Sequence, residues 1–110
     1  MSDEYQNHFY IEGPYVDLVN VTKLLDFSGV STYYDGWEIE GGSAVLHFHT
    51  YYDPHVELYN AAVKYPSLKI VFRYTYALVN AGLVIYEDGR KKLSSYYDWD
   101  TGESSVKKYD

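Results

Sequence analysis

The sequence is clearest at Leu68-Lys69-Ile70-Val71-Phe72-Arg73-Tyr74-Thr75-Tyr76, where a large apolar side chain recurs at every second position. Successive side chains of a β-strand point to opposite faces, so this period of two predicts one buried and one exposed face. Pro66 ends the segment before the stretch, and the turn sequence Asn80-Ala81-Gly82 follows it. The stretch therefore predicts a strand from a sheet that is covered on one side.

Three upstream segments show the same alternation and predict strands: residues 7–12, 33–40 and 44–51. Gly41-Gly42, between the last two, is a hairpin turn sequence. Apolar residues at helical spacing predict two helices, residues 15–27 and residues 54–65. Downstream, a second hairpin is predicted around Asp88-Gly89 from residues 83–87 and 90–97.

The order of these elements is β-α-β-β-α-β, followed by the downstream hairpin. This order is typical of the ferredoxin-like fold. We therefore predict an α+β protein: a ferredoxin-like βαββαβ antiparallel sheet with two helices on one face, plus a C-terminal β extension. Residues 1–97 are expected to form a single domain, and the polar residues 98–110 a frayed tail.

The alternation also assigns residues to the two faces of the sheet. The core is predicted to contain Phe9, Ile11, Leu18, Leu25, Trp37, Leu46, Phe48, Ile70 and Phe72. The open face is predicted to carry His8, Tyr10, Tyr34, Glu38, Glu40, His47, His49, Val71, Arg73 and Thr75.

Three groups of short motifs also carry a family resemblance. They are Asn7-x-Phe9-x-Ile11-x-Gly13-Pro14, then Thr32-x-Tyr34-Asp35, then Phe48-x-Thr50-x-Tyr52-x-Pro54 with Lys64-Tyr65-Pro66-x-Leu68. They resemble segments of the YubB-type ferredoxin-like domains carried on plasmids and phages. Val30 stands where that family usually has a tryptophan, and Ala77-Leu78-Val79 where it often has an acid. The resemblance spans residues 7–89 and implies a ferredoxin-like fold, a mobile-element origin and no known catalysis.

Composition excludes several classes of function. The chain has 110 residues, with 16 Asp and Glu against 9 Lys and Arg, for a formal charge of -7. Such a balance argues against a nucleic-acid binder, which needs basic residues to displace counterions from phosphates, and against docking on anionic lipid. The absence of cysteine excludes disulfides, thiol catalysis and Cys-based zinc sites. The start Met1-Ser2-Asp3-Glu4 lacks signal-peptide features and no apolar run could span a bilayer, so we expect a soluble protein of the host cell cytoplasm.

Tyrosine and acidic residues occur together along the chain. There are 15 Tyr against 4 Phe, and residues 1–63 hold ten acids and one base, whereas residues 64–110 hold six acids and eight bases. The tripeptide Tyr-Tyr-Asp occurs at 33–35, 51–53 and 96–98. Local turn chemistry is one explanation, because Asp starts turns and caps helices. The other is a set of aromatic anchors rimmed with carboxylates that fits a basic protein surface. The partner-binding residues would then be Tyr34, Asp35, Glu38, Glu40, Tyr51, Tyr52, Asp53 and Glu57.

Chemical motifs are few. His47 and His49 share one strand face, with His8, Asp53 or His55 as further candidate metal ligands, but the spacing supplies only two of the three ligands that a metal site usually needs. Glu38 and Glu40 resemble an acid–base pair, yet alternating glutamates are typical of a half-exposed strand. Serine-hydrolase, P-loop and dinucleotide motifs are absent. We predict no catalytic residues, no metal and no cofactor.

These observations predict a non-enzymatic interaction protein from a phage or plasmid. Its acidic, Tyr-rich face would engage a protein with a basic, nucleic-acid-binding surface, as an anti-CRISPR-like nucleic-acid mimic does, without binding nucleic acid itself. Two alternatives stay open. One is a small RNA- or metal-binding module that uses the His and Tyr residues of the open face. The other is a self-associating accessory protein, such as a homodimer joined by sheet edge or sheet face.

Overall fold

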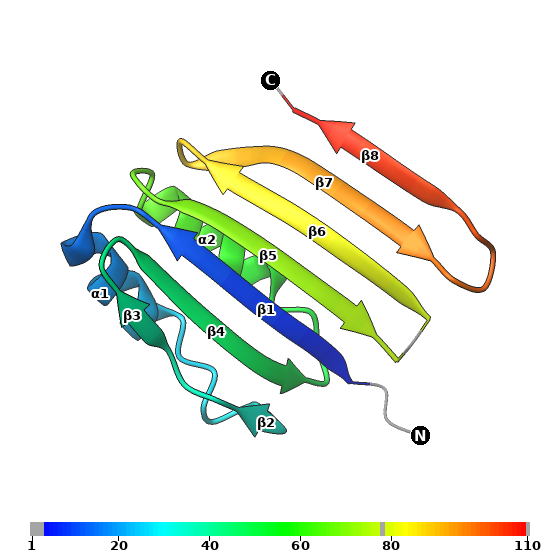
Figure 1. Ribbon diagram of the computed structural model, residues 1–110, viewed down its shortest axis with the longest axis horizontal. Coiled ribbons are helices and arrows are strands. Elements are labelled where there is room, and N and C mark those ends of the chain that lie inside the picture. The colour runs from blue at the N-terminus through cyan, green and yellow to red at the C-terminus, as the bar shows by residue number, and fades with distance from the viewer. Residues whose placement is uncertain (1–3, 78, 110) are drawn as a thin grey trace.

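The computed structural model describes residues 4–77 and 79–109 of the chain. They form one eight-stranded antiparallel sheet with two helices of ten residues each (Figure 1). The strands are β1 (Tyr5–Glu12), β2 (Tyr33–Tyr34), β3 (Glu38–Glu40), β4 (Ser43–Thr50), β5 (Lys69–Tyr76), β6 (Asn80–Glu87), β7 (Arg90–Asp98) and β8 (Ser104–Lys108). The helices are α1 (Tyr15–Leu24) and α2 (His55–Lys64), and each follows a proline, whose restricted φ suits the entry to a helix.

The strands follow the order β2-β4-β1-β5-β6-β7-β8 across the sheet, and β3 also pairs with β4. β1 therefore lies between β4 and β5, and His8 faces His47 on one side and Arg73 on the other. From β5 onward each strand pairs with the next along the chain, so residues 69–108 form a continuous antiparallel meander.

The predicted fold class, a ferredoxin-like βαββαβ sheet with two helices on one face and a C-terminal β extension, is wrong. The finding that overturns it is a single eight-stranded antiparallel sheet in which two short helices are a minor part of the described residues. The chain after β5 does not add a small extension, because β6, β7 and β8 continue the same ladder of backbone hydrogen bonds.

The core lies between the sheet and the helices, which stand behind the sheet in Figure 1. The Phe9 ring is at its centre, with its centroid 5.4 Å from that of Phe48 and 5.0 Å from that of Phe72. The apolar sides of α1 and α2 cover these rings through the buried residues Leu18, Val21, Leu58, Ala61 and Ala62. The predicted core residues are all buried except Trp37, which is half-buried against the cluster. Burial of a large apolar side chain contributes about 1.5–3 kcal/mol, so this cluster is a main source of stability.

The predicted strand over residues 33–40 is divided in two. Gly36 has φ +83°, in the left-handed region that glycine adopts without steric cost. After this bend the Trp37 indole nitrogen donates a 3.0 Å hydrogen bond to the backbone oxygen of Leu25, which draws the ring toward the end of α1. β2 and β3 consequently pair with opposite ends of β4 and form an interrupted sheet edge.

The expectation that residues 98–110 fray is not met where the structure describes them. Asp98 organises a turn: its carboxylate accepts hydrogen bonds from the backbone nitrogens of Asp100 (2.9 Å) and Thr101 (3.2 Å). Gly102, with φ +74°, completes that turn and donates to the Asp98 backbone oxygen at 2.8 Å. The chain reverses there, and β8 pairs with β7 from Tyr97 to Leu93.

Within the described residues, neither helix has the length and apolar character needed to cross a membrane.

Candidate functional site

The structure places the eight predicted partner-binding residues in three different settings. Asp35, Glu38 and Glu40 are exposed along the interrupted edge made by β2, β3 and the bend between them, and we call these three residues the acidic edge. Tyr34 pairs with Phe48, so its side chain lies on the core face and is half-buried. The other four, Tyr51, Tyr52, Asp53 and Glu57, lie in the loop after β4 and the first turn of α2.

Tyr33, rather than Tyr34, accompanies the acidic edge. It pairs with His49 in the sheet register and is 47% exposed. Its hydroxyl donates a hydrogen bond to the Asp35 carboxylate, and this bond raises the pKa of Tyr33. Asp35 also lies 3.7 Å from Nδ1 of His47, so its carboxylate has neighbours on both β2 and β4. Sequence reasoning missed Tyr33 because the pairing with β4, and not the local pattern, decides which tyrosine faces outward.

The four residues between β4 and α2 form their own small network. The Tyr52 hydroxyl donates a 2.7 Å hydrogen bond to Glu57. Partial burial, followed by this bond to a carboxylate, raises the pKa of Tyr52. Tyr51 is 68% exposed and has no side-chain hydrogen bond in the described residues. Across those residues no hydrogen bond or ion pair joins this group to the acidic edge, so the structure does not unite the eight predicted residues in one patch.

The sheet face turned away from the helices, here called the open face, is organised in cross-strand rows. The register places one residue from each of six strands in a central row: His47, His8, Arg73, Leu83, Ser95 and Val106. A second row beside it contains His49, Gln6, Thr75, Ala81, Tyr97 and Ser104. The row on the other side is largely apolar: Val45, Tyr10, Val71, Ile85, Leu93 and Lys108. Of the residues predicted for this face, Tyr34 alone points to the core.

The histidines of the open face lie close together. The ring centroids of His47 and His49 are 5.1 Å apart, and those of His8 and His47 are 6.3 Å apart. Nδ1 of His49 lies 3.8 Å from a carboxylate oxygen of Glu4. Burial, then the charges of Arg73 and His47, lowers the pKa of His8. No group of three or more His, Asp or Glu able to hold a metal ion occurs in the described part of the chain.

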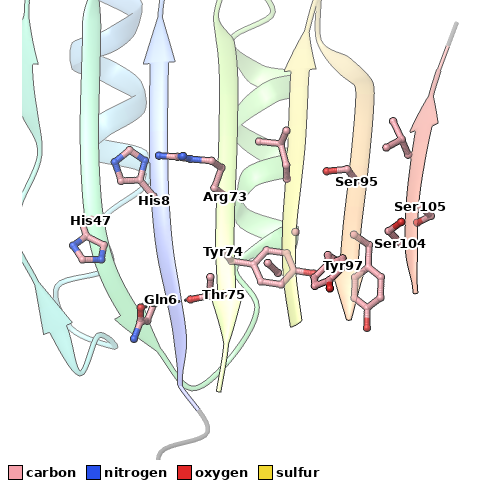
Figure 2. Close-up of a pocket in the computed structure, with 15 residues that line it drawn as sticks. Gln6, His8, His47, Arg73, Tyr74, Thr75, Ser95, Tyr97, Ser104 and Ser105 are labelled. Atoms are coloured by element: carbon pink, nitrogen blue, oxygen red, sulfur yellow. Dashed lines mark hydrogen bonds between the residues drawn. The ribbon is translucent and has the colours of Figure 1, made fainter. Parts of the chain in front are cut away.

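A trough of about 710 Å³ lies on the open face. Figure 2 draws the residues that line it. Its lining comes from β1 and from β4 to β8, and includes Gln6, His8, Arg73, Leu83, Ser95 and Tyr97. The trough is hollow because the small residues Ala81, Ser95 and Ser104 occupy neighbouring positions on this face. Sequence reasoning missed it because six of its fifteen lining residues belong to β7 and β8, where the period-2 pattern fades. The sequence feature that could have indicated the trough is the pair of small residues Ala81 and Ser95, which face outward on the consecutive strands β6 and β7.

Comparisons of the chain with protein-family models, with curated proteins and with solved structures found no match. The resemblance to YubB-type domains therefore stays a prediction from the motifs.

Proposed function

We propose that this chain is a non-enzymatic protein-interaction module from a mobile genetic element, acting in the host cell cytoplasm. Its acidic edge binds the basic surface of a protein or complex that normally binds nucleic acid. The carboxylates of Asp35, Glu38 and Glu40 take the places of phosphates and thereby inhibit the partner. The supporting observation is their exposure along one sheet edge, where none pairs with Lys or Arg among the described residues.

The distribution of charge over the sheet favours this use of the edge. Eight of the nine Lys and Arg residues lie in residues 64–110, which form the end of α2 and strands β5 to β8. The strand order puts β7 and β8 at the far side of the sheet from β2 and β3. The field near the acidic edge is therefore negative with little local cancellation, and such a field accelerates encounter with a basic partner.

Tyr33 supplies an aromatic anchor beside these carboxylates. Tyrosine is enriched among interface residues that dominate binding energy, because it buries a large rigid ring and keeps a polar tip. Its hydroxyl is already held by Asp35, so little side-chain freedom is lost when a partner covers it. In this role it replaces Tyr34, which faces the core.

The test begins with affinity capture to obtain a partner, followed by binding kinetics with the purified partner over a salt series. The association rate should fall as salt rises, because the Debye length shrinks from ~30 Å at 0.01 M to ~8 Å at 0.15 M. The triple variant Asp35→Asn/Glu38→Gln/Glu40→Gln should associate about tenfold more slowly at low salt. Tyr33→Ala should instead raise the dissociation rate.

The matched control is Glu87→Gln/Asp100→Asn/Glu103→Gln, which removes three exposed carboxylates from the opposite side of the sheet. It changes the net charge by the same amount and should leave the association rate almost unchanged. If both triple variants slow binding equally, net charge alone acts and the acidic edge is not the binding surface. If neither changes rate or affinity while the fold is intact, the acidity serves solubility only.

A further inference from the structure

The lining of the trough has an unusual charge composition for this chain. The protein contains 16 Asp and Glu, yet the trough is lined by no acidic residue in the described part of the chain. Its charged and titratable lining consists of Arg73, His8 and His47, together with tyrosines. In a chain with a net charge of -7, this trough is therefore lined by basic and uncharged side chains alone.

The basic groups of the trough gather at one end. His8 is the register partner of both His47 and Arg73, so the three lie side by side on adjacent strands. Figure 2 shows the Arg73 side chain extending over β1 toward His8. Arg73 is exposed and forms no ion pair with any described residue. The charges of Arg73 and His47 contribute, after burial, to the lowered pKa of His8, and an anion placed between these groups would relieve that repulsion.

The opposite end of the trough has a different character. Tyr97, Leu83 and Val106 present apolar surface, and hydroxyl groups come from Ser95 and Ser104. Strands in a sheet are spaced about 4.8 Å apart, so β7 lies about 10 Å from β5, roughly the reach from a phosphate to the base of one nucleotide. The volume of about 710 Å³ falls within the range of small-molecule sites.

We propose that the trough binds a nucleoside monophosphate, with the phosphate held by Arg73 and His8 and the base packed against Tyr97 and Leu83. The guanidinium group suits this role because it offers planar paired donors to phosphate oxygens. The base stacks on or against the tyrosine ring, and the ribose meets the serine hydroxyls. A single nucleotide fits better than a polymer, because a chain with a net charge of -7 repels an extended polyanion. None of the residues assigned to the nucleotide belongs to the acidic edge, so the failure of this site would leave the proposed function standing.

Calorimetry and NMR titration with adenosine 5′-monophosphate test the proposal, with adenosine and inorganic phosphate as separate probes. The nucleotide should bind saturably at millimolar concentration or below and shift the resonances of His8 and Tyr97. Arg73→Gln should weaken its binding about tenfold or more, through loss of a charge-assisted hydrogen bond. Arg90→Gln, the same change at an exposed position outside the trough, should have no effect.

A further variant separates the two ends of the trough. Tyr97→Ala should weaken nucleotide binding about fivefold or more, since base stacking is lost, and should leave the affinity for inorganic phosphate unchanged. The proposal is overturned if the nucleotide causes no saturable shift in trough residues, or if Arg73→Gln binds it like the unmodified protein. Equal affinity for inorganic phosphate and the nucleotide would also overturn it, because nothing would then recognise the base. Tighter binding of a single-stranded oligonucleotide than of the nucleotide would contradict the choice of ligand.

Discussion

The side-chain nitrogen of Asn7 donates a 2.9 Å hydrogen bond to Oγ1 of Thr50 between β1 and β4, and both residues are fully buried. The Thr50 hydroxyl in turn donates to the backbone oxygen of Tyr52 at 2.6 Å. The end of β4 is thereby tied both to the neighbouring strand and to the loop that leads into α2. Buried polar groups are costly unless they are paired, so this connection specifies how the strand end meets the loop.

Thr50→Val should destabilise the protein by about 1–3 kcal/mol, because the Asn7 donor is left without a partner in the core. Urea unfolding followed by circular dichroism measures the change. The double variant Asn7→Val/Thr50→Val should cost less than the sum of the two single variants, since it removes both polar groups together. Strictly additive effects would show that the two side chains do not depend on each other.

Phe48→Ala should lower the free energy of unfolding by about 3–5 kcal/mol, because it empties space at the centre of the core. The Phe48 ring stacks on Phe27 with centroids 4.5 Å apart and meets Phe9 edge-on at 5.4 Å. Val63→Ala, at a position on α2 that is 51% exposed, is the control and should change stability by far less. A loss below about 1 kcal/mol in Phe48→Ala would mean that β4 presents its other face to the core.

His8 should make stability depend on pH. Its pKa is lowered in the folded protein by burial, by Arg73 and by His47, so the unfolded chain takes up a proton first as the pH falls. The contribution of His8 to the free energy of unfolding is therefore fully present at pH values above the ordinary histidine pKa of about 6.5. It is lost as the pH falls from there to the lowered pKa of the folded protein. His8→Gln should reduce the loss of stability between about pH 7 and pH 5, as measured by urea unfolding at several pH values. His55→Gln, on α2, is the matched control, and an unchanged pH profile in His8→Gln would refute the assignment.

Tyr109 should hold β8 in place. The ammonium nitrogen of Lys107 lies 5.0 Å from the centroid of the Tyr109 ring, and that of Lys91 lies 5.6 Å from it. The Tyr109 hydroxyl lies 3.2 Å from the Ser94 hydroxyl. Hydrogen exchange should show protected amides in β8, which a frayed segment would lack. Tyr109→Ala should raise their exchange rates about fivefold, the effect of losing about 1 kcal/mol of cation–π and hydroxyl contacts. Tyr51→Ala, at an exposed loop position, should leave the rates unchanged, and fast exchange throughout β8 in the unmodified protein would contradict its pairing with β7.

Local pattern was sufficient for the faces of the long inner strands. In residues 44–50 and 69–73 the alternation of apolar and polar side chains placed Leu46, Phe48, Ile70 and Phe72 in the core. It placed His47 and Arg73 on the open face, as the structure has them. This works because the period of two is a property of the extended chain itself and needs no partner strand. The sequence likewise showed that acidic residues concentrate in residues 1–63 and basic residues in residues 64–110. The strand order then places these two groups on opposite sides of the sheet.

Pairing between distant segments decided the rest. Residues 104–108 have no apolar period, and they form β8 because the Asp98 turn delivers them to the free edge of β7. Tyr34 faces inward because its register partner is Phe48, and the bend at Gly36 divides the strand that alternation had predicted as continuous. The eight-stranded sheet and the trough across it depend on six strands meeting in one register. Backbone hydrogen bonds are the same for every sequence, so tertiary contacts choose which edge pairs with which, and local periodicity does not encode that choice.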